Sequence, residues 1–183
     1  MTPVHRRTQL PTASARGKLL VAEQVLAPTL TALRASGGPD GPHEGLVLWL
    51  GRTIGTTTVV LAQVCPPART GRDFVLLDER AVAAASRAAR GYELGVVAQV
   101  HSHPGRDTRH SDGDDHLVLM PFEGMFSLVV ASYGSGSPNS GRGAGLHQYQ
   151  DGRWVQITDS QTMVVVPAVA AMAPTAGQAA HDT

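Results

Sequence analysis

Two histidines that flank a single residue, followed by a serine and an aspartate, form the most informative pattern in this sequence. His101 and His103 come directly after an apolar run, and residues 101–114 have the form H-x-H-x7-S-x-x-D. On a β-strand, residues two apart point to the same face, and Pro104 favours extended backbone at His103. Two imidazoles that project together in this way can bind one divalent metal ion.

Ser111 and Asp114 have two compatible interpretations. A serine followed three residues later by an acid is typical of the start of a helix, where the two side chains cap the first backbone N–H groups. The same helix start can direct Asp114 toward the histidines as a third ligand, with Asp112 and Asp115 as alternatives. Two histidines and one carboxylate leave a fourth position for water, as in catalytic zinc sites.

Hydrolysis at such a site also needs a general base. Zinc lowers the pKa of a bound water to about 7, and a base must accept its proton and pass it to the leaving amine. Glu44 is the best candidate, because it opens an apolar run where burial would hold its pKa near the working range. Position along the chain does not by itself bring Glu44 to the histidines. Cys65 is not favoured as a nucleophile, because it precedes Pro66 and Pro67 in a loop with no paired histidine. The other histidines are expected to be structural: His5, His43, His110, His116, His147 and His181.

Hydrophobic spacing predicts the strands and helices that position these residues. The expected strands are residues 46–50, 56–64, 74–77, 94–100, 125–131, 146–150, 153–157 and 163–166. The expected helices are residues 18–34, 79–90 and 116–120, with Pro28 kinking or dividing the first of them. The run before His101 is almost entirely apolar, which is typical of a strand buried on both faces. This order predicts an α/β fold with one mixed central β-sheet flanked by helices.

Length and local composition predict one domain with loose ends. The chain has 183 residues, within the usual size of a single domain. We expect a flexible leader at residues 1–15, the domain at residues 16–160, and an Ala- and Pro-rich tail at residues 161–183 that is largely disordered. Residues 134–145 are rich in glycine and serine and are expected to form a loop.

The charge balance argues against nucleic-acid and membrane partners, and the cysteine count argues against an internal disulfide. Fifteen Lys and Arg residues are matched by 15 Asp and Glu residues, so the chain has no global attraction to nucleic acid or to an anionic membrane. No stretch reaches the roughly 18 apolar residues of a transmembrane helix. A single cysteine excludes an internal disulfide and suits a reducing compartment. We therefore expect a cytoplasmic protein without nucleic-acid or membrane partners.

The three motifs together resemble the JAMM or MPN+ (JAB domain) zinc metalloproteases. That family has a glutamate at the start of a strand, then H-x-H-P, then S-x-x-D, and here these are Glu44, His101-Ser102-His103-Pro104 and Ser111-Asp112-Gly113-Asp114. The resemblance implies the MPN fold, which is cytidine-deaminase-like, and one zinc ion held by His101, His103 and Asp114. It further implies that Glu44 is the general base and acid, and that Ser111 helps to stabilise the oxyanion. The sequence shows none of the long insertions found in eukaryotic chain-specific deubiquitinases, which indicates a compact prokaryotic type.

The resemblance also implies the class of substrate. Family members cleave peptide or isopeptide bonds after the C-terminus of ubiquitin-like or sulfur-carrier proteins, so we expect such a tail as the partner. Three alternatives remain open: a non-catalytic MPN-type scaffold, another zinc hydrolase such as a deaminase, and a calcium-binding acidic loop at residues 112–115. Deaminases carry H-x-E and P-C-x-x-C motifs, whereas this chain has one cysteine, and the acidic loop lacks the ligand spacing of an EF-hand.

Overall fold

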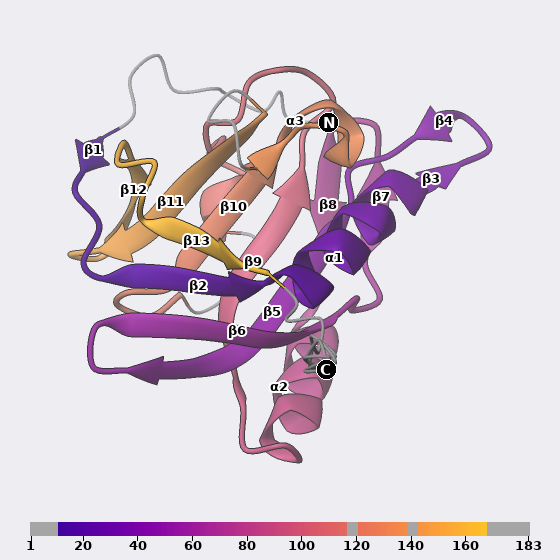
Figure 1. Ribbon diagram of the computed structural model, residues 1–183. Coiled ribbons are helices and arrows are strands. Elements are labelled where there is room, and N and C mark those ends of the chain that lie inside the picture. The colour runs from indigo at the N-terminus through magenta and orange to yellow at the C-terminus, as the bar shows by residue number, and fades with distance from the viewer. Residues whose placement is uncertain (1–10, 117–120, 139–142, 168–183) are drawn as a thin grey trace, which may run out of the picture.

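One mixed β-sheet dominates the fold. The computed structural model describes residues 11–116, 121–138 and 143–167. Within them, nine strands form a sheet in the order β1-β12-β11-β10-β9-β5-β6-β2-β13 (Figure 1). These strands are β1 (Thr12–Ala13), β2 (Lys18–Ala22), β5 (Leu46–Ile54), β6 (Thr57–Val64), β9 (Gly95–Ser102), β10 (Phe126–Val130), β11 (Ala144–Gln150), β12 (Arg153–Ile157) and β13 (Met163–Val166). The expected α/β architecture is confirmed.

The strand that carries the two histidines lies at the centre of this sheet. β9 pairs parallel with β10 on one side and antiparallel with β5 on the other. From Val97 to Ser102 every residue of β9 is buried, and all of β10 is buried too. Strands covered on both faces require continuous apolar sequence, which explains why the run before His101 was readable as a buried strand. The centre of the sheet therefore gives the candidate ligands a rigid support.

Two helices cover opposite faces of the sheet. The helix α1 (Glu23–Ala35) packs its buried face against Val47 and Trp49, whereas α2 (Glu79–Arg90) packs Ala85 against Leu48. Neighbouring residues of a strand point to opposite faces, so α1 and α2 lie on different sides of β5. His101 pairs with Leu46 across the sheet, which places the histidines on the face of Leu48 and α2.

The predicted helix over residues 18–34 is wrong at its N-terminal end. Lys18–Ala22 forms β2, and the helix begins only at Glu23. Leu19 and Val21 are fully buried and alternate with less buried residues, and the strand pairs in parallel with both β6 and β13. Five residues are too few to separate helical from strand periodicity, so the partner strands decide the conformation. The helix continues through Pro28 without being divided.

The sheet extends into both segments expected to be loose ends. β1 lies within the expected leader and pairs with β12, and β13 lies within the expected tail and pairs with β2. The expected leader residues 1–10 and tail residues 168–183 lie outside the described residues, as do residues 117–120 of the short helix expected after the aspartates. What is described there is a 3-10 helix at Asp114–His116.

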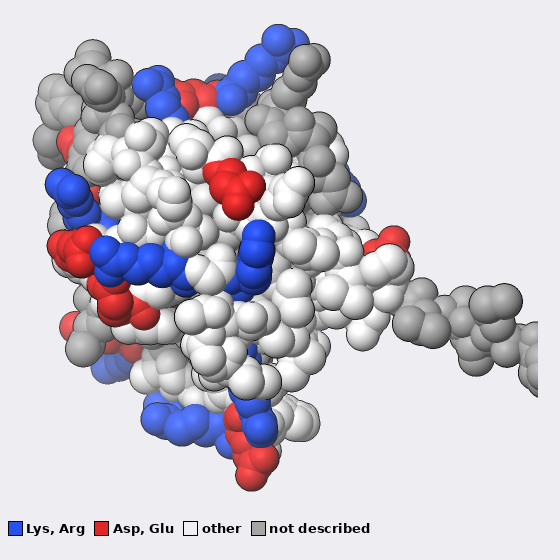
Figure 2. Space-filling view, turned by 60° about the vertical axis from the view of Figure 1, so that its left-hand side comes forward, with Lys and Arg blue, Asp and Glu red and all other residues white. Residues whose placement is uncertain are grey.

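Smaller elements surround the main sheet. They are the hairpins β3 (Gly37–Gly38) with β4 (Gly41–Pro42) and β7 (Arg69–Gly71) with β8 (Phe74–Leu76), and a short segment α3 (Ala131–Gly134) that follows β10. Among the described residues, no helix is long and apolar enough to cross a membrane. On the face drawn in Figure 2, basic and acidic side chains are interspersed and separated by broad uncharged areas.

Candidate metal centre

His101 and His103 project from the C-terminal end of β9 into the interior. His101 is the next-to-last residue of the strand, and its ring centroid lies 5.1 Å from that of His103. The backbone N–H of His103 donates to Val130 O at 2.9 Å, which prolongs the pairing of β9 with β10 beyond the strand end. Both side chains are almost completely buried. The predicted common direction of the two imidazoles is therefore observed, and it follows from strand alternation.

Asp114 reaches the histidines from a capped helical turn. The Ser111 N–H donates to Asp114 Oδ2 at 2.6 Å, and the Asp114 N–H donates to Ser111 Oγ at 3.2 Å. This reciprocal pair is the capping arrangement that the S-x-x-D spacing predicted. Of the alternative ligands, Asp112 is exposed, and Asp115 directs Oδ1 toward His110 Nδ1 at 3.2 Å. Asp114 is thus the carboxylate that joins the two histidines.

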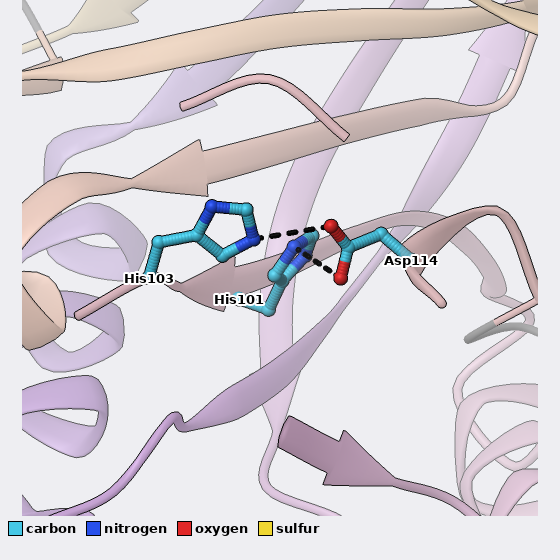
Figure 3. Close-up of side chains that lie close together, drawn as sticks. All are labelled: His101, His103 and Asp114. Atoms are coloured by element: carbon cyan, nitrogen blue, oxygen red, sulfur yellow. Dashed lines mark hydrogen bonds and ion pairs between the residues drawn. The ribbon is translucent and has the colours of Figure 1, made fainter. Parts of the chain in front are cut away.

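The three side chains point their ligand atoms at one another, as Figure 3 shows. Asp114 Oδ1 lies 3.3 Å from His101 Nε2, and Asp114 Oδ2 lies 3.1 Å from His103 Nε2. One ligand atom from each residue falls within 4.8 Å of the other two. Although it is near Asp114, the buried His101 Nε2 makes no hydrogen bond of acceptable geometry. A buried ring nitrogen without a hydrogen-bond partner, next to a carboxylate, fits a metal ion as its partner.

The electrostatics of the cluster favour ionised Asp114. Burial by itself would raise the pKa of the Asp114 carboxyl, but His101 and His103 outweigh it and hold this pKa far below its usual range. Burial would also lower the pKa of His103, but the Asp114 and Glu44 carboxylates outweigh it and raise that pKa above its ordinary value. A carboxylate whose pKa is lowered, beside two imidazoles, is a donor set that matches a divalent cation.

Strand pairing brings Glu44 close to His103. In the antiparallel pair of β5 and β9, Leu46 faces His101, and the Ser102 N–H donates to Gly45 O at 3.1 Å. The same register, if continued by one residue past both strand ends, would set Glu44 against His103, on the face that carries the ligands. Glu44 is buried, with 4% of its surface exposed, and its charge acts on His103. The structure thus brings Glu44 to the candidate metal centre. The bonded neighbours Gly45 and Ser102 are 57 residues apart in the sequence.

Two backbone contacts fix the position of Glu44. Its N–H donates to Gly71 O of the β7–β8 hairpin at 2.8 Å, and its carbonyl oxygen accepts a bond from Ser36 Oγ at 3.1 Å. The neighbouring Gly45 N–H donates to Ser102 Oγ at 2.9 Å, between the two histidines. Sequence reasoning assigned no role to Ser102, and its only signal was its place within H-x-H. The bond to Gly71 O holds Glu44 against the β7–β8 hairpin, and the bond from the next residue to Ser102 Oγ holds this segment against β9.

The comparison with known families agrees with this geometry. Residues 26–141 match the family described as prokaryotic homologs of the JAB domain. The chain belongs to this family. The matched segment contains Glu44 and all three candidate ligands, so the JAMM resemblance drawn from the motifs is confirmed at the level of the family, and the fold is the JAB fold.

The chain is also similar to one curated protein in sequence and to one solved structure in fold. It is 35% identical over 109 residues to "Probable metalloprotease y4jG" of Sinorhizobium fredii (strain NBRC 101917 / NGR234), over 57% of this chain and 66% of that protein, which is just under two thirds of its length. It also resembles the solution structure of protein DSY2949 from Desulfitobacterium hafniense, with a TM-score of 0.63 and 16% identity, over 82% of this chain and 94% of that one. The second likeness concerns the fold alone.

Proposed function

We propose that this chain is a zinc-dependent peptidase or isopeptidase. The observation that carries the proposal is the convergence of His101 Nε2, His103 Nε2 and the Asp114 carboxylate, with the buried Glu44 close to His103. Two nitrogens and one oxygen are the donors of catalytic zinc sites, which keep one position open. A similar protein named a probable metalloprotease supports the same reading.

Each residue of the site would have a separate role in the proposed reaction. When bound, zinc would supply a Lewis acid and an acidified water. Glu44, which is buried and close to His103, would accept the proton of the attacking water and deliver it to the leaving amine. The Ser111 hydroxyl, which lies beside Asp114, would donate a hydrogen bond to the developing oxyanion. The rigid strand β9 would keep the two histidines aligned throughout.

For the substrate we propose the C-terminal tail of a ubiquitin-like protein, cut after its terminal glycine. The β7–β8 hairpin adjoins Glu44 through the bond from Glu44 N–H to Gly71 O. An extended peptide can add a strand to the edge of such a hairpin and so run past the base. Glycines in the tail would allow the close backbone approach that a buried base and buried ligands demand. The leaving group would be a lysine side chain in deconjugation or a C-terminal extension in maturation.

The decisive experiment uses purified zinc-loaded enzyme and ubiquitin-like proteins from its own genome, each fused at its C-terminus to a reporter. We expect cleavage directly after the glycine by the wild type. Glu44→Gln should keep the zinc and the fold and lose about 10²–10⁴-fold in rate, because that is the usual contribution of a general base. Activity of Glu44→Gln within threefold of the wild type would exclude Glu44 as the base. Equal cleavage of unrelated unstructured peptides would reduce the proposal to a general metallopeptidase.

Two related functions are separated by the same experiment. A sulfur-carrier adduct would be the substrate if a carrier protein, and not a ubiquitin-like modifier, were cleaved. A non-catalytic scaffold would bind these tails without cleaving them, and its binding would not depend on Glu44. A cytoplasmic location stays a prediction, which fractionation of the producing cells would test.

A further inference from the structure

A second buried polar network lies behind the candidate metal centre. His110 Nε2 lies 2.9 Å from Ser127 Oγ, and His110 Nδ1 lies 3.2 Å from Asp115 Oδ1. Gln99 Nε2 donates to the same Ser127 Oγ at 3.1 Å. His110, Ser127 and Gln99 are each at most 2% exposed. The four side chains are called the His110 network below.

The connectivity resembles a Ser-His-Asp triad, but burial excludes that chemistry. In such triads the serine bonds to one ring nitrogen and the acid to the other, and the serine must reach the substrate. Ser127 is 0% exposed and is the second residue of β10, a strand that lies between β9 and β11. A hydroxyl in that position cannot attack a substrate. The network must therefore act within the protein.

The place of the network in the fold indicates what it acts on. Gln99 and Ser127 are paired across β9 and β10, two residues before the pair formed by His101 and Val129, and so lie on the same face as His101. The ring centroid of His110 lies 5.7 Å from that of His101. The His110 network therefore lies next to His101, the candidate ligand on β9.

The His110 network also holds the loop that carries Asp114, the third candidate ligand. His110 directly precedes Ser111, and Asp115 directly follows Asp114, so the two residues bracket the capping pair. Both bonds of His110 are made, one to the loop itself and one to the sheet. Asp115 as a carboxylate accepts from Nδ1–H, which leaves Nε2 to accept from the Ser127 hydroxyl. The loop is thereby fixed against β9 and β10 on both sides of Asp114.

We propose that His110 is a positioning residue, which with Ser127 and Gln99 sets Asp114 at the correct distance from His101 and His103. This inference rests on the metal centre proposed above. Groups that orient metal ligands from behind are commonly worth 10–100-fold in metal affinity. A loop held only by its capping turn would let the carboxylate move relative to the strand that carries the imidazoles.

The test measures coordination directly. Wild type, Ser127→Ala, His110→Leu and the conservative His110→Gln are loaded with Co²⁺, whose visible spectrum reports coordination geometry, and zinc affinity is measured by competition with a chelator. Thr29→Val is the matched control, because Thr29 Oγ1 is also a buried hydroxyl, bonded by Trp49 Nε1 at 2.9 Å, but lies on the α1 face. Far-UV circular dichroism establishes that each variant is folded.

We expect Ser127→Ala and His110→Leu to weaken zinc binding by about tenfold or more and to change the cobalt spectrum. His110→Gln, which keeps a polar group for Ser127, should fall between them and the wild type, and Thr29→Val should match the wild type. Wild-type spectra and affinities within twofold in folded Ser127→Ala would overturn the inference, even if His110→Leu did not fold. Failure of the wild type to bind either metal would instead overturn the proposed metal centre.

Discussion

The side chains of His101 and His103 share a direction because they are alternate residues at the end of β9. Asp114 meets them because its own backbone N–H and that of Ser111 are bound in a reciprocal cap. The two halves of the site therefore come from two local structures, a strand end and a capped turn. Each can be tested by changing a single residue.

Removal of one imidazole should remove the metal. His103→Ala leaves one nitrogen and one carboxylate, which rarely hold zinc with an open position. We expect about one zinc per chain in the wild type and a small fraction of that in the variant, by elemental analysis of protein purified without added metal. An unchanged zinc content in His103→Ala would show that His103 is not a ligand.

The capping role of Ser111 and its proposed role at the oxyanion are separated by a matched variant. Ser111→Ala removes the cap at Asp114 N–H, which should cost about 1 kcal/mol of folding free energy, and we expect a loss of about 10²-fold in kcat if the hydroxyl also stabilises the oxyanion. Asp78→Ala removes a comparable cap at the start of α2, where Asp78 Oδ1 accepts from Ala81 N–H at 2.7 Å. Denaturant unfolding and kcat are measured on both. Equal loss of kcat in the two variants would assign Ser111 a capping role alone.

At the scale of elements, the site depends on how β5 lies against β9 and β6. A bulge between Leu50 and Gly51 shifts the pairing of β5 with β6, and β5 shifts against β9 one residue earlier. A Cβ atom on Gly51 would lie 1.9 Å from Val59 O, which is backbone that cannot easily retreat. The glycine is thus required where β6 backbone occupies the position of a Cβ atom, next to the bulge.

Gly51→Ala should accordingly destabilise the sheet. We expect a loss of about 1–3 kcal/mol in the free energy of unfolding, as for other overpacked sites. Gly95 is the control, since it pairs with Gly51 across β5 and β9 but has open space at the position of a Cβ atom. Gly95→Ala should be neutral or stabilising by less than about 1 kcal/mol. Urea unfolding of both proteins measures the difference, and equal stabilities would contradict the close approach.

At the scale of the whole molecule, the candidate ligands lie inside the protein and not on a mobile surface loop. His101, His103 and Asp114 are all buried, and they connect the central strand to the segment between β9 and β10. A metal ion bound only by the folded state stabilises that state through mass action. Metal binding and global stability should therefore be linked.

Chelation should lower the melting temperature of the wild type. Zinc at about 100 times its dissociation constant contributes roughly 2.7 kcal/mol, which for a chain of this size corresponds to roughly 5–10 °C. Calorimetry with and without a chelator measures this shift. His103→Ala should melt at the same temperature in both conditions, because it has no metal to lose. A chelator effect of equal size in the variant would place the stabilising ion elsewhere.

The sequence by itself determined the parts of this protein that depend on near neighbours. The shared direction of His101 and His103 follows from strand alternation, and the cap between Ser111 and Asp114 follows from their spacing. The central strands were readable because strands covered on both faces must be apolar throughout. The resemblance to the JAMM family added Glu44 to this set, which local spacing did not.

Tertiary structure decided what depends on residues distant along the chain. Lys18–Ala22 is a strand and not a helical turn because it pairs in parallel with both β6 and β13. Glu44 lies near His103 because their neighbours Gly45 and Ser102 are joined by two hydrogen bonds at the ends of β5 and β9. His110 acquires Ser127 of β10 as a partner, and Gln99 of β9 donates to the same hydroxyl, whereas the sequence pattern indicated only a structural histidine. In each case pairing between segments that are remote in sequence, which no local periodicity encodes, selects the outcome.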